Sequence, residues 1–338
     1  MTSTAPDAVN EGAGLVFRSD GPLPAAPGLL RVGTRGSRLA VSQTTTVART
    51  IAAATGLDVA LVIITTKGDI SRAPLAQLGG TGVFVSALRD ALLAGACDFA
   101  VHSLKDLPTG PCPGIALGAI PSRADARDAL CAGPGGTLAA LPPGARVGTG
   151  SPRRAAQVLA RRPDLAVLDL RGNVDTRLGR VGVDLDAVIL AAAGLDRIDR
   201  SDAISERFPL DEAPTAAGQG ALAVEVRDED AGAPAIARAL SALDDAESRA
   251  TAIAERTMLA ALEAGCAAPV GATAKVDAGA LTLSAAVYRL DGASSLTASA
   301  QAPWSPTDAQ APAELGRSVA AELLQRGAAA LAPLGGAR

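Results

Sequence analysis

The hydrophobic positions of this chain alternate between short strand-like runs and longer helical runs. Residues 61–64 are apolar and mostly β-branched at successive positions, which is typical of a strand buried on both faces of a sheet. Residues 38–54 form a helical run, with Ser37 as a candidate N-cap and Gly56 as a candidate C-terminal stop. This alternation predicts an α/β fold with largely parallel sheets. Further strands are expected at 30–34, 98–102, 146–149, 166–170, 187–191 and 221–226, and further helices after 82, after Asn173, at 232–241 and at 246–264.

One local pattern occurs twice in the chain. Residues 31–38 and 146–154 both read as a strand, a glycine turn, a serine cap and a helix with arginine in its first turn. Ser151 followed by Pro152 is a strong helix start signal. We therefore infer two related α/β lobes. Each helix N-terminus offers N–H donors and the positive end of a helix dipole, so each repeat predicts an anion site.

The pattern changes after residue 271, where an alternating strand at 281–285 and a terminal helix at 313–331 indicate a small α+β domain. The strand near 221 is expected to return to the first sheet, which makes the first lobe discontinuous. The leading segment is rich in Ala, Pro, Gly and Ser without a hydrophobic signal core. We expect a disordered leader at 1–28, a first lobe at 29–121 plus 221–241, a second lobe at 122–220 and a C-terminal domain at 242–338.

Composition excludes several classes of protein. A net charge of −4 over 338 residues argues against a general nucleic-acid binder. The four cysteines show no CxxC pair, which suits a reducing compartment, and we expect the cytoplasm. His102 is the only histidine, so a multi-histidine zinc site is excluded. No apolar run approaches the roughly 18–20 residues that span a bilayer, so no membrane segment is predicted.

Arginines are placed at strand ends and in first helical turns. Guanidinium groups bind carboxylate or phosphate in bidentate fashion and keep their charge when partly desolvated. Any one of these residues could be an ordinary solvated arginine, but together they predict a cleft for a ligand with several anionic groups. Ligands of such folds lie beyond the carboxyl ends of the strands. The set is Arg35, Arg38, Arg153, Arg154, Arg171, Arg177 and Arg197.

Three further residues have both an ordinary and a chemical interpretation. Lys105 and Asp106 follow a buried strand; as a surface pair they are unremarkable, but among arginines Asp106 would stay ionised and could stabilise a cation or pass a proton. For His102 we favour a packed structural role. Cys266 follows Gly265 at a helix end, and taken alone it is better explained as a small buried residue.

Five motifs occur in order along the chain: 102–108 (HSLKDLP), 148–154 (GTGSPRR), 170–177 (LRGNVDTR), 218–220 (GQG) and 263–266 (EAGC). Together they resemble the porphobilinogen deaminase family, also called hydroxymethylbilane synthase, and the resemblance runs from about residue 29 to the C-terminus. Residues 263–266 resemble its cofactor-attachment loop. The resemblance implies two periplasmic-binding-protein-like lobes around a cleft, a small C-terminal α+β domain and a monomer.

The resemblance also implies an activity. The family is a transferase of tetrapyrrole and heme biosynthesis that carries a dipyrromethane cofactor, here through a thioether to Cys266. Four porphobilinogen units lose ammonia in turn and add head-to-tail to this primer, and water then releases the linear tetrapyrrole. Asp106 is implied as the catalytic residue that stabilises charge at the pyrrole N–H and shuttles protons.

The resemblance further assigns binding residues. Phe84 would pack near the pyrrole rings, although a core phenylalanine is an equally good interpretation. Cofactor binding is implied for Lys105, Ser103, Ser151, Arg153, Arg154, Arg171 and Arg197, and substrate binding for Arg35, Ser37, Arg171, Arg177 and Phe84. The chain departs from the family pattern at Gln77 and Thr81, where many relatives have lysine, and at Ala264-Gly265, where two glycines are frequent.

Two other functions remain open at this point. A two-lobed anion-binding protein without catalysis would use the same arginines, and it predicts an unmodified polypeptide mass. A phosphate-transfer enzyme would use the glycine turns, but the chain lacks a GxxxxGK[ST] loop. We favour the synthase.

Overall fold

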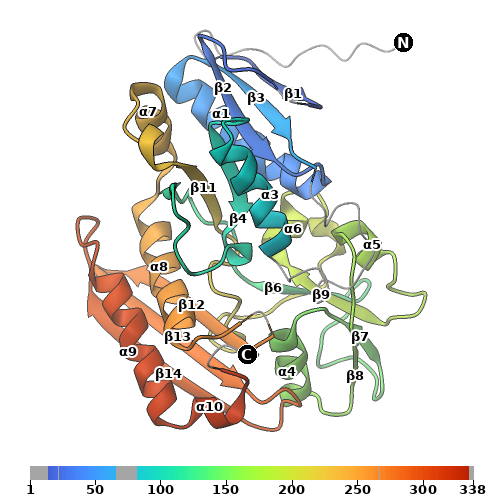
Figure 1. Ribbon diagram of the computed structural model, residues 1–338. Helices are drawn as coiled ribbons and strands as arrows, with labels where there is room; N and C mark the ends of the chain where they lie inside the picture. The colour runs from blue at the N-terminus through green and yellow to red at the C-terminus, as the bar shows by residue number, and fades with distance from the viewer. Residues whose placement is uncertain (1–13, 22, 66–81, 266, 335–338) are drawn as a thin grey trace. The chain divides into compact units, whose positions relative to one another are not determined.

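The computed structural model describes residues 14–21, 23–65, 82–265 and 267–334 (Figure 1). The chain forms two compact units. The first comprises residues 1–102, 111–121 and 223–244, and the second comprises 103–110, 122–222 and 245–338. Within the described part of the chain, no helix is long and apolar enough to cross a membrane.

The first unit is built on a six-stranded sheet with strand order β1-β3-β2-β4-β11-β5. β1, β3, β2 and β4 are parallel, whereas β5 is antiparallel to β11. The α/β prediction is confirmed, and the strand expected near 221 hydrogen-bonds into this sheet. The elements are β1 (Val16–Ser19), β2 (Leu29–Thr34), α1 (Arg38–Thr55), β3 (Asp58–Ile63), α3 (Gly82–Leu93), β4 (Phe99–Ser103), β5 (Ile115–Ala119), β11 (Leu222–Arg227) and α7 (Pro234–Leu243).

Helix α1 begins and ends at the two residues that the sequence indicates. The Ser37 hydroxyl accepts a hydrogen bond from the backbone N–H of Ala40 at 3.3 Å, which satisfies one of the unpaired donors of the first turn. Gly56 adopts φ 71°, a left-handed conformation that ends the helix, and its N–H donates to the Ala52 carbonyl. The face with Val47 and Ile51 is buried.

The expected disordered leader is wrong at Val16–Ser19. These residues form β1, which pairs with β3 in parallel. The Asp58 carboxylate accepts from the N–H of Leu15 at 2.8 Å, and the N–H of Val59 donates to the Leu15 carbonyl at 2.7 Å. Leu15, Val16 and Phe17 are a short run with good strand propensity, hidden in the sequence by the Gly- and Pro-rich residues on either side.

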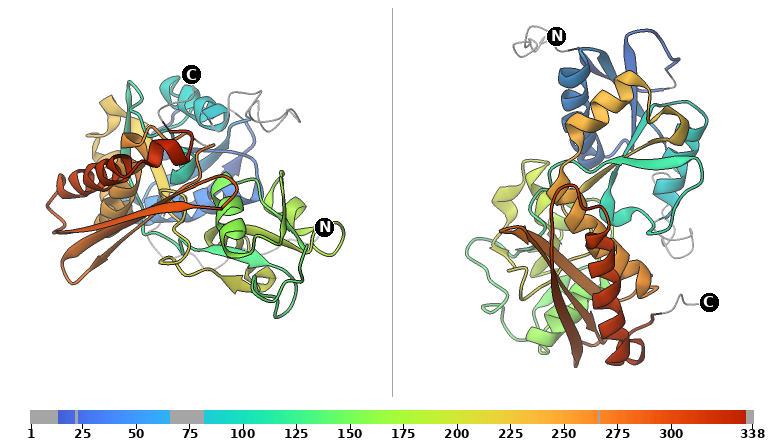
Figure 2. Two further views of the ribbon diagram at one scale, coloured as in Figure 1. Left: turned by 90° about the horizontal axis from the view of Figure 1, so that it is seen from below. Right: turned by 90° about the vertical axis from the view of Figure 1, so that its left-hand side faces the viewer.

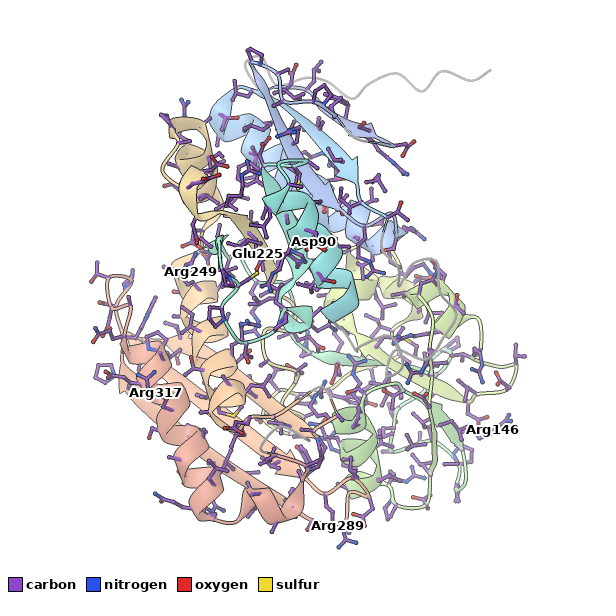
Figure 3. All side chains as sticks on the ribbon, viewed as in Figure 1. Asp90, Arg146, Glu225, Arg249, Arg289 and Arg317 are labelled. Atoms are coloured by element: carbon purple, nitrogen blue, oxygen red, sulfur yellow. The ribbon has the colours of Figure 1, made fainter. Side chains whose placement is uncertain are left out.

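The buried carboxylate of Glu225 joins three elements of the first unit. Glu225 on β11, labelled in Figure 3, contacts Arg89 on α3 (2.6 Å) and His102 on β4 (3.2 Å). Burial alone would raise the pKa of Glu225, but these two partners outweigh it and lower the pKa to about 2. This arrangement agrees with the structural role expected for His102.

The second unit contains a five-stranded sheet with strand order β10-β6-β9-β7-β8. β9, β7 and β8 are parallel, but β6 is antiparallel to both β9 and β10, so the sheet is mixed. Its core includes Leu130, Val147, Val158 and Ile189. The elements are β6 (Asp128–Cys131), β7 (Arg146–Gly148), α4 (Pro152–Arg161), β8 (Ala166–Leu168), α5 (Val174–Leu178), β9 (Ala187–Ala191), α6 (Ala192–Asp196) and β10 (Glu206–Arg207).

The same unit carries a three-stranded antiparallel sheet of β12, β13 and β14, with α8 and α9 covering one face (Figures 1 and 2). Leu283 on β13 packs with Met258 on α8 and Val319 on α9. Gly316 permits close helix contact, because a Cβ there would lie 2.5 Å from the Ala254 carbonyl oxygen. The elements are α8 (Ala246–Ala261), β12 (Val270–Asp277), β13 (Ala280–Tyr288), β14 (Ser295–Pro303), α9 (Ala311–Gln325) and α10 (Ala328–Leu331).

Candidate active site

The Lys105-Asp106 pair lies on a single 3-10 turn, η1 (Leu104–Asp106), which starts where β4 ends. Leu104 is completely buried, and its N–H donates to the Ala221 carbonyl at 3.0 Å. Arg256 on α8 donates to the carbonyls of Leu104 and Leu107 at 3.2 and 2.9 Å. The backbone of this turn is therefore fixed from two sides, which restricts where its two charged side chains can lie.

Asp106 is a partly exposed carboxylate among cations. Among the residues that the structure describes, no group donates a hydrogen bond to it or pairs with it. Its charge nevertheless acts on Lys105 and Arg177, raising the pKa of each against the effect of burial. The carboxylate is thus available to a cationic or N–H-bearing ligand.

Lys105 is an exposed residue, but its ammonium group is desolvated by neighbouring protein and donates to Gln219 Oε1 at 3.3 Å. This desolvation, together with the positive charge of Arg154, lowers the pKa of Lys105 to about 8. Asp106 opposes the shift. The side chain can therefore gain or lose its charge close to neutral pH, unlike an ordinary surface lysine.

Arg153 and Arg154 begin helix α4, whose N-cap is Ser151 and whose first residue is Pro152, as predicted. Both arginines are buried and bind one internal carboxylate, that of Asp128. Arg153 Nη1 lies 2.7 Å from Asp128 Oδ2, and Arg154 Nη2 lies 2.7 Å from Oδ1. Burial would raise the pKa of Asp128, but the two guanidinium groups hold it well below its usual range.

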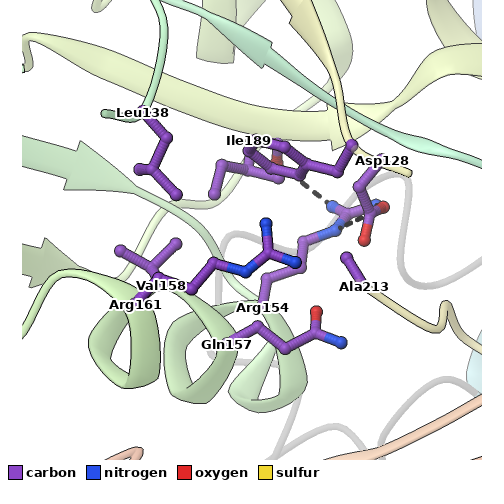
Figure 4. Close-up of a pocket in the computed structure, with 9 residues that line it drawn as sticks. Asp128, Leu138, Arg154, Gln157, Val158, Arg161, Ile189 and Ala213 are labelled. Carbon is purple, nitrogen blue, oxygen red and sulfur yellow. Dashed lines mark hydrogen bonds and ion pairs between the residues drawn. The ribbon is translucent and has the colours of Figure 1, made fainter. Parts of the chain in front are cut away.

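Figure 4 shows the contact of Arg154 with Asp128 at the edge of a small cavity lined by Leu138, Val158 and Ile189. Arg154 also donates from Nη1 to the Ile189 carbonyl at 3.1 Å. One carboxylate balances only one of the two guanidinium charges, so the cluster retains a net positive charge. Arg153 and Arg154 therefore contribute a positive field at the α4 N-terminus, and all of their described side-chain hydrogen bonds go to other groups of the protein.

The remaining predicted arginines of this unit lie at loop and helix ends. Arg171 follows β8, is exposed, and pairs with Asp169 at 3.1 Å. Arg177 on α5 donates from Nε to the Gly172 carbonyl at 2.8 Å, and burial lowers its pKa. Arg197 at the end of α6 donates to the Gly220 carbonyl at 2.7 Å.

Four predicted residues belong to the first unit. Arg35 follows β2, Ser37 uses its hydroxyl as the N-cap of α1, and Arg38 is the first residue of that helix. Phe84 lies on α3, but its side chain is outside the described part. Cys266, the expected cofactor anchor, also lies outside the described residues, as do Gln77 and Thr81.

Comparison with known proteins assigns the chain to a family. The pattern described as "Porphobilinogen deaminase, dipyromethane cofactor binding domain" matches residues 30–234, and that of "Porphobilinogen deaminase, C-terminal domain" matches residues 249–325. The chain belongs to the porphobilinogen deaminase family. This confirms the resemblance seen in the sequence motifs.

Porphobilinogen deaminases from several bacteria are similar over nearly their whole length. The protein from Leifsonia xyli subsp. xyli is 60% identical over 95% of this chain and 99% of its own length. That from Thermobifida fusca is 54% identical over 88% of this chain and 94% of its own length. Among solved structures, a periplasmic substrate-binding protein of an ABC transporter from Coxiella burnetii covers 63% of this chain and 91% of its own, at 15% identity and a TM-score of 0.41.

Three residues of this candidate site are not predicted from the sequence as parts of it. Asp128 is the shared partner of two arginines, Asp169 pairs with Arg171, and Gln219 lies against Lys105 and Arg154. Gln219 could have been found, since it is the centre of the Gly-Gln-Gly motif. Nothing in the local sequence singles out Asp128. Among the described residues no cluster of metal-ligating side chains is present.

Proposed function

We infer that this chain is a hydroxymethylbilane synthase, a transferase of tetrapyrrole biosynthesis that acts on porphobilinogen. It joins four porphobilinogen units head-to-tail with loss of ammonia on a covalent dipyrromethane primer and releases the linear tetrapyrrole by hydrolysis. The observation that carries this conclusion is family membership over almost the entire chain. The alternative of a non-catalytic anion-binding protein is not favoured by it.

The residues around η1 fit a dipyrromethane. Such a group carries acetate and propionate side chains, and the arginines and Lys105 supply the positive charge that carboxylates require. When bound, the cofactor supplies the free pyrrole end that accepts the first substrate unit. We propose that Cys266 holds it through a thioether. The residues proposed to bind it are Ser103, Lys105, Ser151, Arg153, Arg154, Arg171 and Arg197.

For porphobilinogen we propose a second set of contacts: Arg35, Ser37, Arg171, Arg177 and Phe84. The Ser37 position at the N-terminus of α1 supports this, because backbone N–H groups and the helix dipole favour a carboxylate there. The exposed guanidinium of Arg171 and the partly exposed one of Arg177 can reach a ligand. Arg153 and Arg154 stay in the proposed cofactor-binding set, where their positive charge attracts the cofactor carboxylates.

We propose Asp106 as the catalytic residue. When porphobilinogen loses ammonia, positive charge spreads to the pyrrole nitrogen, and a carboxylate that accepts a hydrogen bond from that N–H stabilises it. The same carboxylate can take up and return a proton as the ring recovers aromaticity. The cationic field on Asp106 and its lack of a described hydrogen-bond partner support this role.

The intact mass of the protein tests the proposed function. The full chain from cofactor-competent cells should carry a dipyrromethane-sized adduct, and Cys266→Ser should remove it together with all turnover of porphobilinogen. Cys112→Ser is the matched control, since Cys112 is a partly buried cysteine outside the motifs and should keep the adduct. An unmodified wild-type mass without porphobilinogen consumption would instead support the anion-binding alternative.

Substitution of Asp169 should change substrate affinity without removing activity. Its carboxylate oxygen Oδ2 forms an ion pair with Arg171 Nε at 3.1 Å, so a substrate carboxylate that binds Arg171 must compete with Asp169. Both side chains are exposed, so the pair is weak, and Asp169→Asn is expected to lower the KM for porphobilinogen by about two- to fivefold. Steady-state kinetics at low salt measures this. An unchanged or raised KM would mean that Asp169 orients Arg171 and does not compete for it.

We also propose the three-domain organisation predicted from sequence, with the first lobe extended to include β1, and a monomer that acts in the cytoplasm. Separate hydrophobic core clusters at each of the three sheets support the first proposal. Cys97, Cys112 and Cys131 are all unpaired thiols, which supports a reducing compartment.

A further inference from the structure

The side chain of Gln219 uses its entire hydrogen-bonding capacity inside the protein. It is completely buried. Its Oε1 accepts from Lys105 Nζ at 3.3 Å and from Arg154 Nη2 at 3.2 Å. Its Nε2 donates to the Ala126 carbonyl at 2.7 Å and to Asp128 Oδ1 at 2.9 Å. One amide therefore connects the η1 turn to the charged cluster at the start of α4.

The partners fix which way the amide points. Ala126 and Asp128 offer only acceptors, so the NH₂ group must face them, while Lys105 and Arg154 offer only donors, so the oxygen must face those. The Lys105 and Arg154 cations repel each other, as the lowering effect of Arg154 on the pKa of Lys105 shows. A shared neutral acceptor holds the two cations close together without cancelling their charge.

The backbone of the turn is shaped to place this one side chain. Gly218 and Gly220 have φ of 76° and 86°, a region that favours glycine. A Cβ on Gly220 would lie 2.4 Å from the Ala124 carbonyl oxygen, and one on Gly218 would lie 3.0 Å from Leu104. The turn thus packs directly on η1 and has room for a side chain only at its centre.

Several groups hold the turn without using the Gln219 amide. Arg123 Nε donates to the Gln219 carbonyl at 2.8 Å, and the N–H of Gly218 donates to Glu255 at 2.7 Å. Glu255 is completely buried; it also binds Arg123 at 2.9 Å and accepts from the N–H of Ala274 at 2.8 Å. A change confined to the side chain of residue 219 should therefore leave the backbone in place.

We propose that Gln219 is a positioning residue of the synthase reaction, whose amide sets the place and orientation of the Lys105 ammonium and the Arg154 guanidinium relative to Asp106. The positioning role rests on the proposed function, but the contacts of Gln219 with Lys105 and Arg154 can be tested without turnover. It also gives the Gly-Gln-Gly motif a physical role that neither the cofactor thiol nor the catalytic carboxylate explains.

The ionisation of Lys105 reports on the contact directly. Charged groups face it from three elements, namely Asp106 on η1, Asp128 on β6, and Arg153 and Arg154 on α4. Gln219→Met removes an acceptor from the ammonium form, so the pKa of Lys105 should fall below about 8. Gln219→Glu adds a negative charge beside the ammonium, so the pKa should rise, by about one unit or more.

The chain allows this measurement because it contains only three lysines, Lys67, Lys105 and Lys275. Trace acetylation at a series of pH values, followed by peptide mass spectrometry, gives the pKa of each lysine separately. Cys266→Ser in the full-length chain serves as the background, so that the result does not depend on a bound cofactor. Gln157→Met is the matched control, since Gln157 is a buried glutamine that contacts Arg153 and Tyr288, and no contact with Lys105 is described.

Opposite shifts of the Lys105 pKa in the two Gln219 variants, with none in Gln157→Met, are the expected result. In the cofactor-loaded enzyme the alkaline limb of kcat/KM should move in the same directions. If the Glu variant does not fold, the neutral Met variant decides alone. An unchanged Lys105 pKa in folded variants that have lost activity would reduce Gln219 to a packing role and overturn the proposal. A wild-type protein without adduct or turnover would contradict the proposed function. The Lys105 pKa would still test the contact between Gln219 and Lys105, because that measurement needs neither cofactor nor turnover.

Discussion

Replacing Asp106 with asparagine is expected to lower kcat by about 10²–10⁴-fold, while the protein stays folded. The substitution keeps the size of the side chain and removes its charge. The Asp106 carboxylate acts on the charges of Lys105 and Arg177 but has no described hydrogen-bond partner. Its removal therefore breaks no described hydrogen bond within the protein. Single-turnover measurement of porphobilinogen consumption, with a thermal melt as the folding check, measures both parts of this expectation.

Asp169→Asn is the matched control for this experiment. Its carboxylate also lies in the field of Arg177, and the same unit of charge is removed, yet it should retain near wild-type kcat. Activity of Asp106→Asn within tenfold of wild type would mean that another group stabilises the cationic substrate. Equal losses in both variants would point to overall charge, and not to a positioned carboxylate, as the cause.

Asp128→Asn is expected to lower the free energy of unfolding by about 3–5 kcal/mol, because two buried guanidinium groups would lose their shared counter-ion. The pKa of Asp128 is depressed in the folded protein, so its stabilisation is fully present above the unfolded value of about 4 and is lost progressively as pH falls from that value through the much lower folded pKa. Urea unfolding at pH 7 and at about pH 3 should therefore show the difference between variant and wild type narrower at pH 3 but not abolished.

Asp202→Asn provides the surface comparison. Asp202 pairs with Arg200 at 3.7 Å and is mostly exposed, so its loss should cost less than about 1 kcal/mol at either pH. If Asp128→Asn unfolds at the wild-type urea concentration, the charge at residue 128 does not stabilise the fold, and the two arginines must be balanced in another way.

The local features of this fold could be predicted because they depend on neighbouring residues. Ser37, Ser151 and Asn173 were each expected to cap a helix, and each accepts a hydrogen bond from a backbone N–H three residues later. Such contacts need only the right side chain at one position and helix-forming residues after it. They also place the N-termini of α1 and α4 after the carboxyl ends of β2 and β7.

The internal partners of the site could not be predicted because they are distant in sequence. Asp128 lies 25 and 26 residues before its two arginines, and Gln219 lies 114 residues after Lys105. Sequence reasoning assigned Arg153 and Arg154 to a ligand, since a lone sequence shows the guanidinium groups without showing the buried carboxylate that binds them. Strand β1 could not be predicted for a similar reason, because its partner strand β3 is about 43 residues away in the sequence.

The buried carboxylate of Glu255 constrains the length of the chain that follows it. It ties helix α8 to Arg123, to the Gly218 turn and to β12 at once, so the helix can neither rotate nor slide. Each residue inserted after Glu255 would turn the rest of the helix by about 100° and advance it by about 1.5 Å. The span from Glu255 to Gly265 should consequently tolerate exchanges of exposed side chains far better than any insertion or deletion.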